Sequence, residues 1–349
     1  MTCTRKRLAC LSHLAGAVAL AALSTVCLAQ TYTITDLGTI TKNSDSYSAA
    51  KGVNATAEVT GAASSNGDGG SEVFTWSDGV MTGLGTLGGN SGIGNGINAS
   101  GQVAGYAQNS AGTYRAFLAT NGVLTDIGDL GGGSAVAYGL NDSGQVVGSA
   151  VTADGSNHPF LYSNGVMTDL GTLGSPNGNA WWNSAQGVNK SGVVTGTSYD
   201  AQGNFFAFSY SNGKMTQMGT LGGSWSQGYA INNRGQVAGL AYTKSGAAHA
   251  FLANCATCTL KDLDASGGDT TTSWGFAIND SGVVVGQFTA GGGYHAFVYS
   301  GGKFQDLNKL IPAGTGWMLV EANGINASGQ IVGLGTIKNA EHAYLLTPR

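Results

Sequence analysis

A ten-residue pattern of small, aliphatic and polar positions recurs along almost the whole chain. It places a small residue, an aliphatic residue and an asparagine in succession, and it ends on a glycine seven positions after the asparagine. The repeat asparagines, spaced 43 to 48 residues apart, are Asn54, Asn98, Asn141, Asn189, Asn232, Asn279 and Asn326. Self-similarity at this period indicates a repeat architecture.

Each repeat contains four short apolar segments with the composition of β-strands. In the third copy we predict strands at residues 137–141, 145–149, 158–162 and 166–170. Asn-x-x-Gly joins the first two, and Ser-Asn-Gly joins the last two. Asparagine and glycine tolerate positive φ, so both strings predict tight hairpin turns.

The two ends of the repeat array decide between a closed ring and an open stack. Residues 33–38 form a fourth strand with no first three before it, and residues 342–346 form a third strand with no fourth after it. Together they complete one unit, as in a propeller whose N-terminal strand pairs with its last blade. Four strands and about 45 residues per unit are also typical of propellers. We therefore predict an all-β, seven-bladed β-propeller; the alternative is an open β-solenoid, which would need capping ends.

Composition agrees with an all-β fold rich in turns. The 349 residues include 59 glycines and 4 prolines; 42% are hydrophobic and 10% charged. Glycine without a Gly-X-Y period excludes collagen, and the apolar content argues against disorder. The net charge is −4, and no basic cluster suits a phosphate backbone, so we expect no nucleic-acid partner.

The N-terminus has the organisation of a secretory signal peptide. Arg5, Lys6 and Arg7 precede an apolar run over residues 8–26, and small residues suit cleavage after Ala29. A lipoprotein anchored through Cys27 is the alternative, although the residues before it form a poor lipobox. We expect residues 1–29 to be removed and residues 30–349 to form one propeller. No second long apolar run follows, so no membrane span is expected.

The third strand of the repeat carries a His-Ala-Phe triplet, intact at residues 249–251 and 295–297 and varied in the other copies. Segments related to Asp-Leu-Gly-Thr-Leu-Gly-Gly occur at residues 83–89, 126–132 and 169–174. In these features the chain resembles the HAF-repeat family of extracellular bacterial proteins, over essentially all of residues 30–349. The resemblance implies a repeat fold and export to the periplasm or the exterior of a Gram-negative-type bacterium. It transfers no catalytic residue.

All histidines after the signal peptide occupy the same place in the repeat: His158, His249, His295 and His342. The other blades place Glu72, Arg115 and Phe206 there. Equivalent positions on separate blades point away from one another, so we expect a structural role and neither a metal nor a cofactor.

One cysteine pair, Cys255 and Cys258, remains after removal of the signal peptide. It lies in a lengthened turn between a third and a fourth strand. In an oxidising compartment this arrangement favours a disulfide; a redox or zinc site is the alternative, but it lacks partner residues.

Aromatic residues gather in the loops that lead into the first strands of five blades. They are Tyr47, Trp182, Trp225, Trp274 and Trp317. If the ring closes, these loops share one face near the channel. Aromatic rings there would form a surface on which sugars or aromatic ligands could stack. Alternatively, the rings plug the channel or pack between blades.

From these features we expect a non-enzymatic binding or surface-interaction module, monomeric and exported. Its expected partner is an extracellular ligand such as a glycan. One alternative is a polysaccharide lyase or hydrolase acting on the channel face, for which Asp154, Asp200 and Glu321 are isolated candidate acids. Another alternative is a structural component of a matrix or adhesin.

Overall fold

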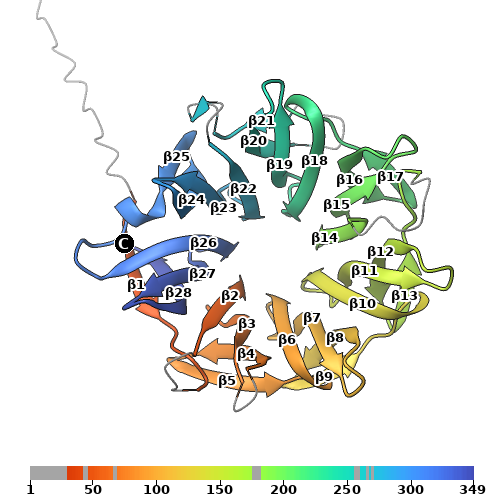
Figure 1. Ribbon diagram of the computed structural model, residues 1–349, viewed down its shortest axis with the longest axis horizontal. Coiled ribbons are helices and arrows are strands. Elements are labelled where there is room, and N and C mark those ends of the chain that lie inside the picture. Colours follow the sequence, from red (N-terminus) through yellow and green to blue (C-terminus); the bar gives the residue numbers. More distant parts are fainter. Residues whose placement is uncertain are drawn as a thin grey trace, which may run out of the picture.

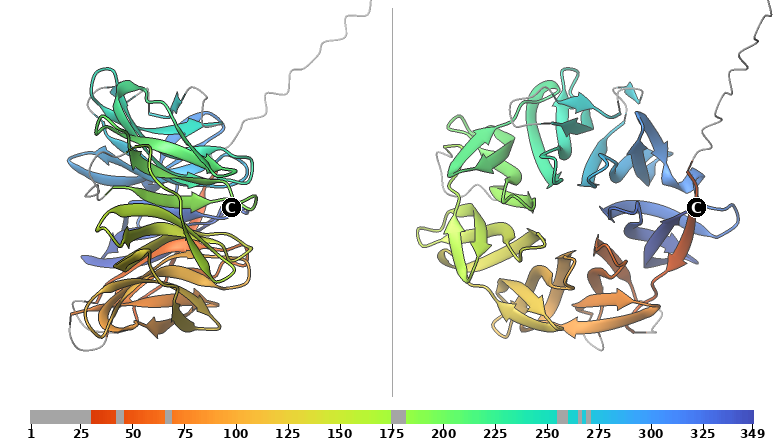
Figure 2. Two further views of the ribbon diagram at one scale, coloured as in Figure 1. Left: turned by 90° about the vertical axis from the view of Figure 1, so that its right-hand side faces the viewer. Right: turned by 180° about the vertical axis from the view of Figure 1, so that it is seen from behind.

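The computed structural model describes residues 30–41, 46–65, 69–174, 182–254, 260–264, 267–268 and 271–349. These residues form seven four-stranded antiparallel sheets, arranged as blades around a central channel (Figure 1). Seen edge-on, the ring is a thick disc (Figure 2). The predicted seven-bladed β-propeller is confirmed, and the open solenoid is wrong.

In each blade the four strands follow one another from the channel outwards. The first, innermost strands are β2 (Ser48–Val53), β6 (Gly88–Ile97), β10 (Gly131–Leu140), β14 (Ser184–Val188), β18 (Gly222–Ile231), β22 (Ser273–Ile278) and β26 (Trp317–Ile325). The second strands are β3 (Val59–Ser64), β7 (Val103–Asn109), β11 (Val146–Thr152), β15 (Val194–Tyr199), β19 (Val237–Thr243), β23 (Val284–Ala290) and β27 (Ile331–Ile337).

The outer half of each blade consists of the third and fourth strands. The third strands are β4 (Ser71–Ser77), β8 (Tyr114–Thr120), β12 (Asn157–Ser163), β16 (Phe205–Ser211), β20 (Ala248–Ala253), β24 (Gly293–Ser300) and β28 (Ala340–Pro348). The fourth strands are β5 (Val80–Gly85), β9 (Val123–Asp126), β13 (Val166–Asp169), β17 (Lys214–Gln217), β21 (Lys261–Asp262), β25 (Lys303–Asp306) and, in the seventh blade, β1 (Tyr32–Asp36). A 3₁₀ turn, η2 (Leu307–Lys309), follows β25.

The ring is closed by the two ends of the chain, as predicted. β1 pairs antiparallel with β28, from Tyr32 opposite Pro348 to Asp36 opposite Tyr344. The N–H of Arg349 donates to the carbonyl of Thr31 at 2.9 Å. The N-terminal strand β1 therefore pairs with β28, which would otherwise be an unpaired edge of the last blade.

Within each blade, the aromatic residue of the third strand packs against the glycine that ends the repeat pattern. Phe160 is fully buried and lies against Gly148 of β11. A Cβ added to Gly148 would lie 2.0 Å from the carbonyl oxygen of Val136 and 2.7 Å from Cε1 of Phe160. The same clash with a first-strand carbonyl, at 1.7–2.0 Å, occurs at the equivalent glycine of all seven blades. Steric exclusion thus explains why the pattern ends on glycine.

The predicted turns of the third blade are present, but its first strand is longer than predicted. In the Ser-Asn-Gly turn of the third blade, Asn164 and Gly165 both have positive φ, at 51° and 83°, as type I′ hairpins require. β10 begins at Gly131 rather than at residue 137, and its pairing with β11 shifts register between Gly131 and Ala135 and again between Ala137 and Gly139. Such shifts are typical of β-bulges, which interrupt the regular pairing of a strand.

Candidate functional site

The channel is lined by the first strands, which contribute a layer of seven aliphatic side chains. Each belongs to the residue before a repeat asparagine: Val53, Ile97, Leu140, Val188, Ile231, Ile278 and Ile325. The repeat asparagines surround the opening on one side of this layer, and the first strands begin towards the opposite face. The two openings of the channel are therefore lined by different residues.

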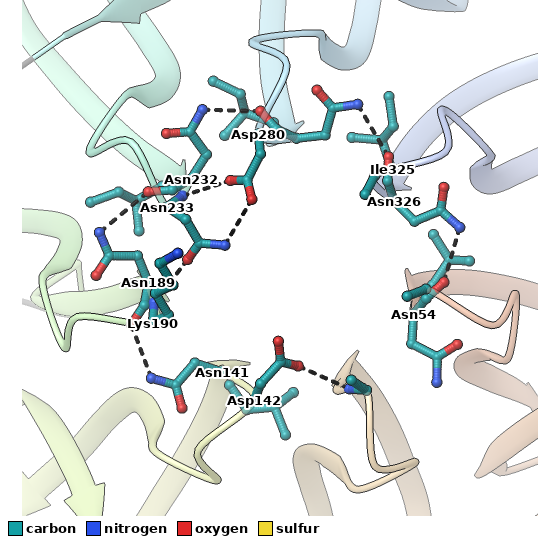
Figure 3. A pocket seen from close by; sticks show the side chains of 18 of the residues that line it. Asn54, Asn141, Asp142, Asn189, Lys190, Asn232, Asn233, Asp280, Ile325 and Asn326 are labelled. Carbon is teal, nitrogen blue, oxygen red and sulfur yellow. Dashed lines mark hydrogen bonds between the residues drawn. The ribbon is translucent and has the colours of Figure 1, made fainter.

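The repeat asparagines form a closed circle of hydrogen bonds around the first opening, and Figure 3 shows the part of it between Asn141 and Asn54 that runs through Asn232. Each side-chain amide donates through Nδ2 to the backbone carbonyl of the equivalent asparagine in the next blade, at 2.9–3.3 Å. The last of these bonds runs from Asn326 to Asn54 at 2.9 Å and joins the seventh blade to the first. The circle thus closes the ring a second time, independently of β1.

Each asparagine also shapes its own turn. Oδ1 of Asn141 accepts from the backbone N–H of Ser143 at 3.0 Å and of Gln145 at 3.1 Å. Its Nδ2 donates to Oε1 of Gln145 at 2.7 Å as well as to the carbonyl of Asn189. Aspartate would serve the turn equally well but could not donate. The sequence interpretation identified the turn and missed the bond between blades, although the choice of asparagine over aspartate at every copy was a usable signal.

The opening inside this circle is a cavity of about 280 Å³ whose rim is already internally bonded. Oδ1 of Asp142 accepts from the N–H of Ala99 in the neighbouring blade at 2.9 Å. Asp280 accepts from both the backbone and the side chain of Asn233, at 2.8 and 2.9 Å (Figure 3). These contacts join adjacent blades, so the polar groups of this rim hold the ring together.

The five predicted aromatic residues do not form one continuous arc, and none is among the residues that line the channel cavities. Trp274 contacts Tyr294 of its own blade at 6.0 Å between ring centroids. Trp317 contacts His342 and Tyr344 of its own blade. Tyr47 is half-buried; its N–H donates to Oγ of Ser64 at 2.9 Å, and its carbonyl accepts from the N–H of Ser64 at 3.0 Å.

Trp182 and Trp225, by contrast, belong to one continuous group that crosses from the fourth blade to the fifth. Phe205 lies between them, parallel to Trp182 at 6.5 Å and tilted against Trp225 at 4.5 Å. Tyr199 contacts Phe205 at 5.5 Å, and Tyr242 contacts Trp225 at 4.1 Å. We call these five rings the aromatic ladder. Trp182 is 57% exposed, and the other four rings are half-buried.

The ladder was only partly accessible to sequence reasoning. Trp182 and Trp225 stand at the same distance from their repeat asparagines, and this made them visible. Phe205 and Tyr242, which connect and extend them, come from a third and a second strand. Their placement depends on how neighbouring blades pack, so no offset within one repeat reveals it.

The histidines of the third strands pair with aspartates of the fourth strands. His158, His249 and His295 contact Asp169, Asp262 and Asp306 through Nδ1 at 2.8–3.0 Å, and His342 contacts Asp36 at 2.9 Å across the ring closure. The hydrogen bond from Asp262 raises the pKa of His249, although burial opposes the shift. In the second blade Arg115 takes the place of histidine and pairs with Asp126 at 2.8 Å.

The first blade inverts this pairing. Glu72 of β4 occupies the histidine position, and the opposing strand carries Gly83, where a Cβ would lie 2.4 Å from Oε2 of Glu72. That carboxylate oxygen accepts from the N–H of Gly85 at 3.1 Å. In this blade the acid therefore stands on the third strand instead of the fourth, and it stabilises the hairpin that these two strands form.

Two sequence predictions lie outside the described residues. They are the signal peptide at 1–29 and the pair Cys255 and Cys258. Within the part of the chain that is described, no helix is long and apolar enough to cross a bilayer. The same part contains no group of three His, Cys, Asp or Glu side chains placed to hold a metal ion.

Comparisons with known proteins identify the class of fold. No protein-family model matches the chain, and no curated protein is similar to it. Among solved structures, the β-propeller domain of the Trilobed protease from Pyrococcus furiosus is 11% identical with a TM-score of 0.57, covering 88% of this chain and 96% of that one. That domain is described as having an open velcro topology, whereas here β1 and β28 pair.

Two peptidases share the same fold over a larger chain. A puromycin-hydrolysing peptidase from Mycobacterium tuberculosis is 12% identical with a TM-score of 0.56, covering 83% of this chain and 49% of that one. An acylaminoacyl peptidase from Pyrococcus horikoshii is 12% identical with a TM-score of 0.52, covering 90% and 53%. This chain spans about half the length of these peptidases. At such identities the likeness shows the β-propeller fold alone.

Proposed function

We propose that this protein is an exported binding module and that the aromatic ladder holds its ligand, a glycan. The observation that carries the proposal is Trp182, which is 57% exposed at the end of a continuous row of rings. Export rests on the signal peptide predicted at residues 1–29. Membership of the HAF-repeat family is likewise proposed, on the triplets at 249–251 and 295–297.

The ladder suits a ligand made of several linked units. Sugar rings present apolar C–H faces that stack on aromatic rings, and each such contact contributes on the order of 1 kcal/mol. Successive rings here come from two blades, which favours an elongated glycan lying across their boundary. A single small aromatic ligand would need only one of these rings.

Polar groups beside the ladder can hydrogen-bond sugar hydroxyls. Asp200 and Asn204 lie in the turn between Tyr199 and Phe205, and Lys244 directly follows β19. Oδ1 of Asp200 already accepts from two backbone N–H groups at 2.9 Å, which fixes the carboxylate in place. Asn204 and Lys244 are exposed. A rigid aromatic surface with polar groups at its edge is a usual composition of ligand sites.

A glycan array tests the proposal. The protein without residues 1–29 should bind a subset of oligosaccharides, and Trp182→Ala should weaken that binding several-fold. Phe205→Ala should weaken it further, because this ring joins the two halves of the ladder. Tyr294→Ala is the matched control, since Tyr294 is 50% exposed and lies outside the ladder.

Two outcomes would refute the proposal. The first is that the wild-type protein binds no glycan on the array. The second is binding that Trp182→Ala and Tyr294→Ala weaken to the same extent, because the ladder would then have no special part in it.

A polysaccharide-active enzyme is the second candidate, and one contact favours it. Among the three acids considered from the sequence, Glu321 lies in the channel with its Oε2 3.6 Å from Nζ of Lys51, a base beside a cation. Asp154 is less suitable, because hydrogen bonds from Thr152 and Ser156 lower its pKa to about 2. Release of reducing or unsaturated ends from the array's bound glycans, lost in Glu321→Gln, would establish this function.

A further inference from the structure

The channel opening opposite the asparagine circle is a well of about 420 Å³. Leu140, Val188 and Ile231, members of the aliphatic layer, are at its base. Its walls are formed chiefly by the residues three positions before each repeat asparagine. Its volume lies within the range of small-molecule sites, about 300–1,000 Å³.

The well has two unlike walls. Tyr138 of β10, Tyr229 of β18 and Phe276 of β22 contribute rings, and the last two contact each other at 5.7 Å between centroids. Lys51 of β2 and Glu321 of β26 contribute charges on the other wall, where the first and seventh blades meet. Figure 1 places β10 and β18 across the channel from β26 and β2, whereas β22, which carries Phe276, lies beside β26. The sevenfold repeat therefore encloses an asymmetric site.

The polar wall is held in place but is not closed. Nζ of Lys51 and Oε2 of Glu321 are 3.6 Å apart, and the two side chains are 32% and 27% exposed. Direct ammonium–carboxylate hydrogen bonds are about 2.7–2.9 Å long, so the two groups are not directly hydrogen-bonded, and because both are partly exposed a ligand hydroxyl in the well can approach either of them. Asn323 fixes the carboxylate by donating to the same Oε2 at 3.2 Å and to the carbonyl of Ala50 at 3.1 Å.

The charges and rings define the class of ligand. Lys51 and Glu321 cancel, so the well has no net charge to select an anion or an organic cation. Burial raises the pKa values of Tyr138 and Tyr229, and these hydroxyls stay protonated and neutral. One wall thus suits an apolar face and the other suits hydroxyl groups, which is the amphipathic pattern of a pyranose ring.

We propose that the well binds one neutral sugar residue, with a ring face against Tyr229 and Phe276 and hydroxyls at Lys51, Glu321 and Asn323. This site is separate from the aromatic ladder, which lies farther out between the fourth and fifth blades. It takes a single residue, either free or at the end of a chain, whereas the ladder takes an extended segment.

Saturation-transfer NMR and calorimetry with D-glucose, D-galactose, D-mannose and N-acetyl-D-glucosamine test the proposal. At least one of these sugars should bind the wild-type protein. Lys51→Met and Glu321→Gln should each weaken it about tenfold, the effect of one lost charge-assisted hydrogen bond. The matched controls are Lys190→Met and Asp142→Asn, which alter the rim of the opposite opening and should change the affinity less than twofold. Thermal melts of each variant establish that it is folded.

Three results would overturn the well as a sugar site. They are no binding of any of the four sugars, equal losses in the well variants and the controls, and preferential binding of glycine betaine or acetate. The proposal also stands apart from the ladder. Trp182→Ala should leave monosaccharide binding intact, and failure of the well would leave glycan-array binding through the ladder untouched.

Discussion

Replacing Asn141 by aspartate separates the two tasks of the repeat asparagine. The carboxylate can still accept from the N–H groups of Ser143 and Gln145, so the turn keeps its shape. It can no longer donate to the carbonyl of Asn189 or to Oε1 of Gln145, which lie 2.9 and 2.7 Å from Nδ2. The substitution therefore removes the contact between the third and fourth blades while preserving the local fold.

The expected cost is about 2–4 kcal/mol of unfolding free energy. The carbonyl of Asn189 keeps the N–H of Gly192 at 3.0 Å, so it is not left unpaired, and each lost bond costs about 1 kcal/mol. The remainder comes from the new charge, because residue 141 is only 7% exposed and would face two oxygen atoms. Burial should raise the pKa of this carboxyl group, so the penalty should shrink as acid protonates it.

Urea unfolding followed by tryptophan fluorescence measures this cost, with Asn109→Asp as the matched control. Oδ1 of Asn109 accepts from Ala111 and Thr113 at 3.0 Å in the same kind of turn, within its own blade. We expect Asn109→Asp to change the unfolding free energy by less than about 0.5 kcal/mol. Equal effects of the two substitutions at neutral pH would refute the role of the asparagine circle in joining blades.

Three further predictions concern the ends of the chain, the cysteines and the histidines. Deleting residues 31–38 removes β1 and leaves β28 unpaired, so the truncated protein should melt at a lower temperature than the full ring; an unchanged melting temperature would contradict closure by β1. Mass spectrometry should find Cys255 joined to Cys258, and changing both to serine should alter the melting temperature little, because the loop they close is very short. The raised pKa of His249 implies that its stabilisation is complete below its ordinary pKa of 6.5 and is lost as pH rises through the folded-state value. Melting temperatures across this range should therefore fall less in His249→Gln than in the wild type, and parallel curves would contradict the pairing with Asp262.

The repeat pattern predicted the architecture because the backbone geometry of each blade requires particular residues at fixed positions. Gly148 and its equivalents have no space for a Cβ, and Asn141 and its equivalents are needed for both a turn and a contact between blades. Such requirements act at every copy, so they appear as periodic residues. The unpaired strand at each end then indicated closure, because one sequence fragment supplies what the other lacks.

The candidate sites were less predictable because they depend on departures from the repeat. Phe205 and Tyr242 join the ladder through packing between blades, which no single repeat encodes. Glu321 was visible only as an isolated acid, since its partner Lys51 stands at the other end of the sequence. Ring closure brings these two residues together, so their contact became apparent only in three dimensions.

The binding role of the aromatic ladder is tested most directly by titrating the protein with an oligosaccharide retained on the glycan array, following tryptophan fluorescence and thermal melts in parallel. For a ligand surface, the oligosaccharide should change the fluorescence of the wild type, and Trp182→Ala should weaken binding several-fold with little loss of melting temperature. Fluorescence that does not respond to the ligand, together with a loss of about 3–5 kcal/mol of stability in Trp182→Ala, would contradict this account and make the ring part of the core.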